Sequence, residues 1–205
     1  MKRAVLILLS IAVFLLPSAK GADKDKPRFV AGAASSYAGH QTLDKITIAA
    51  VPFLTDEQIK SAFGKADPLR YGVLPVLVVL ENGTGKALRL DLQAELVTAD
   101  ERHQEAVSPD DVQRTGANLK PRRVPGGSTP LPIPLPKGIK KGPLNVWEIE
   151  GRAFAAKFLP PGESASGFFY FLGEHEPGQR LYLTGVKDAS TGKDFFYYEV
   201  PLQTQ

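Results

Sequence analysis

The chain has 205 residues, none of them cysteine, with 25 basic side chains against 22 acidic ones. Without cysteine there is no disulfide framework, no thiol nucleophile and no thiolate metal site. Lys2, Arg3 and Lys20 are the charged residues of segment 1–21, so the remaining 184 residues carry no net charge. Whole-chain charge therefore gives no argument for nucleic-acid binding, and we expect none.

The N-terminus has the layout of a secretory signal peptide. Two basic residues precede an uncharged, Leu-rich stretch over residues 4–16, and residues 17–21 supply a helix breaker and small residues. These thirteen residues, all apolar except Ser10, fall short of the roughly 20 that span a bilayer as a helix. We expect cleavage near Gly21/Ala22 and a periplasmic or secreted protein with no transmembrane segment, with an uncleaved membrane anchor as the alternative. Residues 22–205 are predicted to form a single domain.

The first predicted elements are a strand and a short helix. Residues 44–53 place apolar side chains on one face of a strand. Thr55 and Gln58 form a capping box, in which each side chain can bond the backbone N–H of the other residue. A helix of about two turns is predicted to follow and to end at Gly64.

Residues 73–97 predict two strands joined by the turn "ENGTGKA". Residues 73–80 are apolar throughout, as in a strand buried on both sides, and residues 88–96 alternate, as in a strand with one wet face. We predict a hairpin in which Asn82 and Gly83 adopt positive φ. A phosphate-binding loop is excluded because Leu80 stands where that motif needs glycine. Asn82-Gly83-Thr84 is alternatively an N-glycosylation acceptor.

Residues 120–143 break the pattern, with seven prolines, four glycines and no acidic residue. We expect a basic loop that meets an unknown protein or an anionic envelope polymer, or that docks onto its own acidic domain. Its candidate binding residues are Lys120, Arg122, Arg123, Lys137, Lys140 and Lys141.

The C-terminal third predicts four more strands, over residues 153–159, 167–172, 180–186 and 195–202. Alternatively, Asn145 and Glu148 could cap a short helix through "AFAAK". Seven or eight short strands, separated by turns rich in Gly, Pro, Asp and Ser, predict a sandwich or barrel. The aromatic runs at 168–171 and 195–198 belong either to the core or to an exposed platform for a sugar ring. The candidates for that platform are Tyr170, Tyr182, Tyr197 and Tyr198.

Two stretches, "LPVLVVLENGTGKALRLDL" and "FLPPGESASGFFYF", resemble exported bacterial immunoglobulin-like domains. The resemblance implies an all-β, immunoglobulin-like antiparallel β-sandwich of about seven or eight strands, with one or two short helices and the Pro-rich insertion. Such domains are mostly binding or structural modules, and the resemblance carries no catalytic residue. The chain lacks the Cys–Trp–Cys pattern of antibody domains.

Catalytic patterns are weak in this sequence. "GESASG" around Ser164 and Ser166 fails the nucleophile elbow, which would need glycine at position 166. His175 lies between two glutamates in a turn, but metal sites need three or four converging ligands. We therefore expect no enzyme, no cofactor and no metal, with an enzyme centred on His175 as a third hypothesis. The leading hypothesis is an exported, non-enzymatic structural or protein-interaction module of the cell envelope, and the alternative is a carbohydrate- or cell-wall-polymer-binding module.

Overall fold

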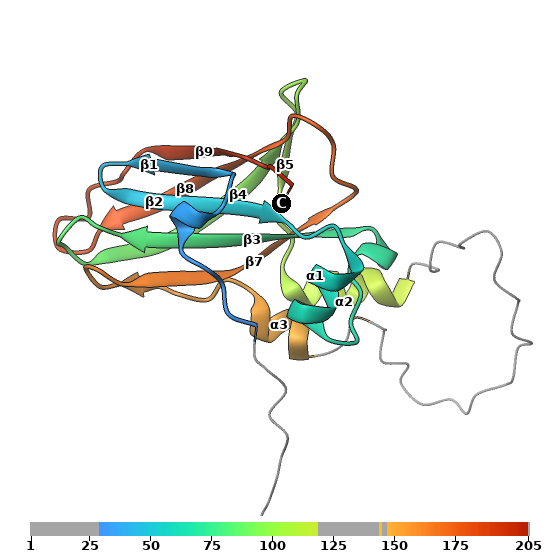
Figure 1. Cartoon of the computed structure of the whole chain (residues 1–205). Coiled ribbons are helices and arrows are strands. Elements are labelled where there is room, and N and C mark those ends of the chain that lie inside the picture. The colour runs from blue at the N-terminus through green and yellow to red at the C-terminus, as the bar shows by residue number, and fades with distance from the viewer. Residues whose placement is uncertain (1–28, 119–143, 145–146, 205) are drawn as a thin grey trace, which may run out of the picture.

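Two antiparallel sheets dominate the computed structural model, which describes residues 29–118, 144 and 147–204 (Figure 1). Within these residues there are nine strands. The first sheet has the order β1-β2-β3-β7, with strands His40–Leu43, Ile46–Pro52, Val73–Asn82 and Ser164–Leu172. The second has the order β5-β4-β8-β9, with strands His103–Glu105, Leu88–Val97, Arg180–Asp188 and Tyr197–Pro201, and β6 (Phe158–Leu159) also pairs with β4. The predicted β-rich class with antiparallel sheets is confirmed, although the described residues include three α-helices where one or two short ones were predicted.

One core lies between the two sheets, where apolar side chains from both inner faces meet. From the first sheet it includes Ile46, Ile48 and Val78, and from the second Leu88 and Leu183. The predicted alternation along β4 is confirmed, because its apolar positions are buried except at one irregularity. The register of β4 against β8 shifts between Leu90 and Gln93, which leaves Leu92 only half-buried.

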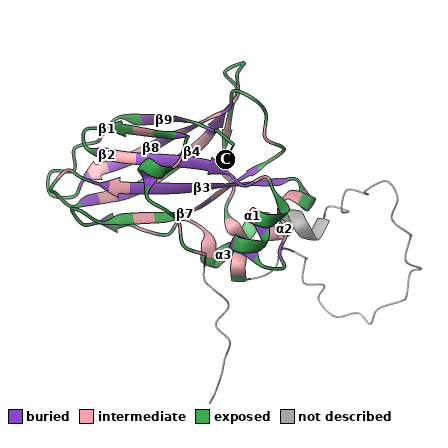
Figure 2. Ribbon diagram, in the orientation of Figure 1, coloured by how far each residue is buried: buried purple, intermediate pink, exposed green. Residues whose placement is uncertain are grey.

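A second core lies on the outer face of the first sheet, under three helices (Figure 2). These are α1 (Asp56–Phe63), α2 (Pro109–Asn118) and α3 (Trp147–Arg152). Because both faces of β3 are covered, Val73–Leu80 is buried at every position, as predicted. The capping box is also confirmed: Gln58 N donates to Thr55 Oγ1 over 3.3 Å, and Thr55 N donates to Gln58 Oε1 over 3.1 Å. No helix in the described ranges is long and apolar enough to cross a membrane.

The predicted hairpin is wrong. Both sides of β3 are occupied, by β2 and by β7, so β4 joins the other sheet and residues 83–87 cross between the sheets. The positive φ in this turn belongs to Gly85, at 77°, and not to Asn82 or Gly83. Gly83 is required for a different reason, because a Cβ there would lie 2.7 Å from the carbonyl oxygen of Lys45.

Other predicted elements differ in extent from those in the structure. Of the strand predicted over 153–159 only β6 forms. A short helix, α3, is present, but it ends at Arg152 and does not run through "AFAAK" as the alternative predicted. The helix α2 was not predicted. The Pro-rich stretch 120–143 and the segment 1–28 lie outside the described residues, so the predicted insertion and signal peptide stay predictions.

The two open sides of the sandwich differ. On one side β1 and β9 close it, where Glu199 N donates to Gln41 Oε1 over 3.0 Å. On the other side β7 faces β4, and two crossing segments bond the edge of β7. Val107 N donates to the carbonyl oxygen of Tyr170 over 2.8 Å, and Phe154 N donates to that of Phe168 over 3.0 Å. The segments that contain Val107 and Phe154 leave a groove between them.

Candidate functional site

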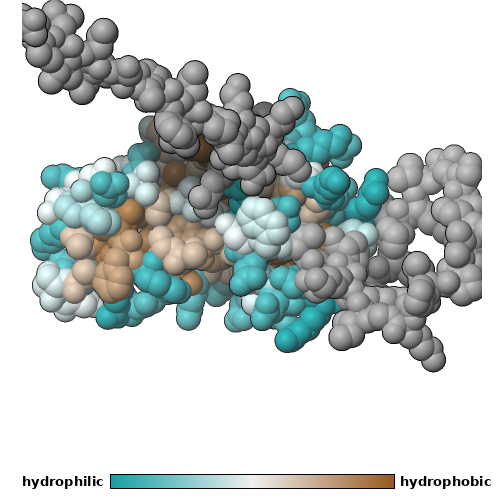
Figure 3. Space-filling view, turned by 90° about the horizontal axis from the view of Figure 1, so that it is seen from below, coloured by the Kyte–Doolittle hydropathy of each residue, from teal (hydrophilic) through white to brown (hydrophobic). Residues whose placement is uncertain are grey.

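A groove of about 550 Å³ opens on the side where β7 faces β4. Its walls are residues 92–95 of β4, residues 105–109, residues 153, 154 and 157, and residues 168–170 of β7. Seen from the β7 side, apolar surface gathers between polar borders (Figure 3). We call this feature the β4–β7 groove.

The floor of the β4–β7 groove is apolar. The rings of Phe154 and Phe169 stack with centroids 5.7 Å apart and an interplanar angle of 16°. Both rings, with Leu92 and Ala106, are half-buried and pack against the core between the sheets. A ligand side chain placed here would extend that core, which is the usual source of affinity in a binding cleft.

One wall of the groove is a strand edge that is only partly paired. On this side of β4, β6 pairs with Leu88 and Arg89, and β5 pairs with residues 95–97. Two further bonds extend the paired parts: Leu90 N donates to Lys157 O over 2.8 Å, and Ala106 N donates to Ala94 O over 2.9 Å. Among the described residues, positions 91–93 have no strand partner on this side.

The partly paired edge coincides with the bulge in β4. Asp91 and Leu92 together lie opposite Gly185, whose φ is 86° and whose Cβ, if present, would lie 2.0 Å from Asp91 O. The bulge therefore depends on glycine at position 185. It bends the strand beside the groove, a location where bulges often serve a binding site.

The rim of the groove is polar. Gln93, Glu105 and Lys157 are exposed. Glu95 is half-buried, and its Oε2 lies 2.6 Å from His103 Nδ1. The rim thus combines two carboxylates with one ammonium group around an apolar floor.

The predicted aromatic platform is corrected by burial. Tyr170 is 1% exposed, and its hydroxyl donates to Ile149 O over 2.7 Å, while Tyr198 is fully buried. Burial raises the pKa of both phenols, for Tyr198 to about 12. Only Tyr182 and Tyr197 remain at the outer face of the second sheet, with stacked rings 5.2 Å apart. Because these two rings cover each other, they offer a sugar less face than four separate tyrosines would.

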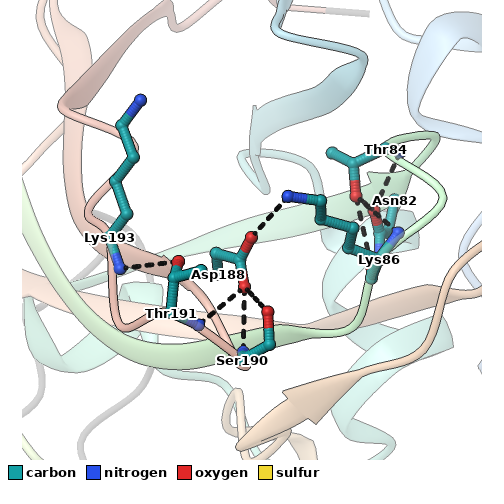
Figure 4. A network of polar contacts seen from close by, with 7 residues as sticks. All are labelled: Asn82, Thr84, Lys86, Asp188, Ser190, Thr191 and Lys193. Carbon is teal, nitrogen blue, oxygen red and sulfur yellow. Dashed lines mark hydrogen bonds and ion pairs between the residues drawn. The ribbon is translucent and has the colours of Figure 1, made fainter.

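The turn at residues 82–86 forms a structural clasp with the loop after β8 (Figure 4). Lys86 Nζ lies 3.0 Å from Asp188 Oδ2, and Asp188 Oδ1 accepts from Ser190 N, Ser190 Oγ and Thr191 N. These bonds hold the pKa of the Asp188 carboxyl well below its usual range, with the Ser190 hydroxyl as the largest cause and Lys86 next. A carboxylate on the lysine of "GTGK" agrees with the exclusion of a phosphate loop.

The glycosylation alternative also fails at this turn. Asn82 is 2% exposed, and its Nδ2 lies 2.7 Å from Lys86 O and 3.0 Å from Leu159 O. Its Oδ1 accepts from both the backbone N–H and the hydroxyl of Thr84. An amide in these contacts is inaccessible in the folded protein.

The three histidines lie apart and make local contacts. His175 Nδ1 is 3.0 Å from Gln179 Oε1, and His40 Nδ1 is 2.6 Å from Tyr37 O. In the part of the chain that the structure covers, no three His, Cys, Asp or Glu side chains gather as metal ligands would. The six basic residues predicted to bind a partner all lie outside the described residues. Sequence reasoning also missed the β4–β7 groove, because its walls come from four separate segments.

The comparisons with known proteins leave the family open. No family model and no curated protein matches this chain. Among solved structures, a match is the crystal structure of a Bordetella pertussis protein provisionally named ApaA. It is 17% identical, has a TM-score of 0.31, and the match covers 80% of this chain and 90% of that one. A likeness of this degree supports no argument about fold or function.

Proposed function

We propose that this chain is an exported, non-enzymatic protein-interaction module of the cell envelope with an immunoglobulin-like sandwich. Its ligand is an extended peptide of a partner protein, bound in the β4–β7 groove. The leader-like layout of residues 1–21 supports export, and the sequence resemblance to exported immunoglobulin-like domains supports a binding role.

The observation that carries the proposal is the interrupted edge of β4. Leu90 N and Ala94 O bond the segments on the groove side, whereas Asp91 and Gln93 lie against β8, so within the described ranges the backbone groups of Leu92 between them are placed to bond an added strand. At about 3.3 Å per residue, such a gap accommodates a segment of roughly three or four residues. An extended peptide supplies the matching donors and acceptors.

The floor and rim define the peptide further. An added strand next to β4 would direct every second side chain toward Phe154 and Phe169, so an aliphatic or aromatic residue fits there. Glu95 and Glu105 outnumber Lys157 on the rim. We therefore expect a peptide with one apolar anchor next to a basic residue.

Site-specific photocrosslinking in cells tests this function. A photoreactive amino acid replaces Gln93 in the groove, and a matched control replaces Thr42, an exposed strand residue of the first sheet. We expect position 93 to capture one partner through a short contiguous peptide, identified by mass spectrometry, and position 42 to capture none. Equal capture at both positions would refute the proposal.

A second variant separates binding from folding. Ala106→Trp fills the groove floor from a half-buried position and should abolish capture while the far-UV circular dichroism stays unchanged. If capture persists in a folded Ala106→Trp protein, the groove is not the contact. A capture at position 93 that is lost on polysaccharide digestion would instead favour the carbohydrate alternative.

A further inference from the structure

The α3 face exposes large apolar side chains at one spot. Trp147, the first residue of α3, is 72% exposed, and Val30 is 82% exposed. The indole of Trp147 lies over Gly151, with its Cε3 3.3 Å from the position that a Cβ would take. Val30 and Gly151 line the same hollow of about 310 Å³. We use the name α3 face for the surface formed by Val30, Trp147 and Gly151.

The N-terminal part of the chain is attached at this same face. The ring of Phe29 packs 5.6 Å from that of Phe53 and 5.8 Å from that of Phe168. Arg152 of α3 contacts Phe29 in two ways. Its Nη1 donates to Phe29 O over 3.1 Å, and its guanidinium lies 5.9 Å from the centroid of the Phe29 ring. Residue 29 is therefore fixed beside α3 in the folded domain.

The position of this attachment limits how far the α3 face can lie from a bilayer that holds the N-terminal stretch. The apolar stretch 4–16 ends thirteen positions before residue 29, and a fully extended chain of that length reaches at most about 45 Å. While that stretch is held in a membrane, as a signal sequence or as an anchor, residue 29 and the α3 face beside it stay within this distance of the lipid.

We propose that the α3 face is a membrane-contacting surface and that Trp147 inserts its ring among the lipid headgroups. Tryptophan is enriched at membrane interfaces because its large ring is apolar and its N–H still reaches water. Val30, which lines the same hollow as Gly151, adds exposed apolar area to this face. The helix also carries the exposed carboxylate of Glu150, so the contact suits zwitterionic lipid and does not require anionic lipid.

The protein contains its own probe, because Trp147 is its sole tryptophan. The full chain is made by cell-free synthesis in the presence of phosphatidylcholine vesicles, which keeps segment 1–21 attached. We expect the emission of Trp147 to shift to shorter wavelength than in lipid-free detergent-solubilised protein. We also expect its intensity to fall when acyl chains brominated near the headgroup replace ordinary ones.

The matched control moves the probe to another exposed position. The double variant Trp147→Phe/Phe196→Trp places the indole beside β9 in the other sheet, where Phe196 is 77% exposed. We expect this indole to show no quenching by brominated lipid. Both changes are at exposed positions, so the fold should persist, and far-UV circular dichroism checks that it does.

Three results would overturn the membrane contact. Quenching of equal size at positions 147 and 196 would mean that lipid meets the protein without a preferred face. A Trp147 emission that is already at short wavelength without lipid, and that brominated lipid leaves unchanged, would place residues 119–143 or other protein atoms over the ring. A lipid-independent shift that grows with protein concentration would assign the face to a second copy of the chain. None of these results bears on the β4–β7 groove.

Discussion

Replacing Asn82 by alanine should be among the most damaging single changes at a polar residue of this protein. Asn82 ends β3 at the point where the chain leaves the first sheet for the second. Its buried amide joins three segments: its own turn through Lys86 O, the segment after β6 through Pro160 O, and β6 itself through Leu159 O.

The size of the effect follows from the bonds that are lost. The two hydrogens of Nδ2 can satisfy two of those carbonyls fully, and Oδ1 accepts two bonds from Thr84. Four bonds at about 1 kcal/mol each give a loss of about 4 kcal/mol. The net loss is smaller, because water can hydrogen-bond the partly exposed Thr84 in the variant. We expect Asn82→Ala to lower the free energy of unfolding by about 2–4 kcal/mol.

Urea denaturation followed by far-UV circular dichroism measures this difference, because Trp147 is too exposed to report on the core. Thr84→Val is the control: it removes the hydroxyl that donates to Asn82 Oδ1 and that also accepts from Lys86 N. Because the contacts with Lys86 are exposed, it should cost about 1 kcal/mol. Asn82→Asp should be at least as damaging as alanine, since a carboxylate would then face three carbonyl oxygens. A loss no larger than that of Thr84→Val, or a tolerated aspartate, would refute the reasoning.

Three further predictions concern the backbone and pH. Gly185→Ala should lower the unfolding free energy by at least about 2 kcal/mol, because a methyl group at position 185 would overlap Asp91 O; Gly192→Ala, also at positive φ but in open space, should cost about 1 kcal/mol. The raised pKa of Tyr198 means that its contribution to stability is complete below about pH 10, the unfolded value, and is lost as the pH rises toward about 12. Tyr198→Phe should reduce the loss of stability at alkaline pH. It should not destabilise the protein at neutral pH, since the buried hydroxyl has no hydrogen-bond partner among the described residues. A variant that is less stable at pH 7 would contradict this. The lowered pKa of Asp188 gives stability that is present above about pH 4 and is lost at lower pH, so Asp188→Asn should lower the Tm at pH 7 and weaken the acid dependence measured by thermal denaturation.

Local patterns in the sequence were enough to predict several elements. Thr55 and Gln58 mark the start of α1 because the capping box is made within four residues. The apolar run of β3 and the alternation of β4 indicate how many faces of each strand are covered, because side chains alternate across a strand. What covers β3 was not predictable in the same way, since α2 and α3 pack on it from distant parts of the chain.

The candidate site shows the limit of pattern reading most directly. Nothing near Phe154 indicates that its ring will stack on Phe169, because the contact exists only once residues 153–157 cross the edge of β7. Four tyrosines share similar surroundings in the sequence, yet two are buried and two lie at the surface. Exposure depends on which face of which sheet each strand presents.

The sequence by itself determined the strand-rich class, the position of α1, the buried character of β3 and the one-sided character of β4, because each depends on the order of polar and apolar residues over a few positions. Only the tertiary structure decided that the turn at Asn82 crosses between sheets. A tight turn permits either a hairpin or a crossing, and the choice depended on β7, more than 80 residues further along the chain, which occupies the edge of β3 that a hairpin would have needed. The same choice separates β4 from β7 and so creates the groove between them.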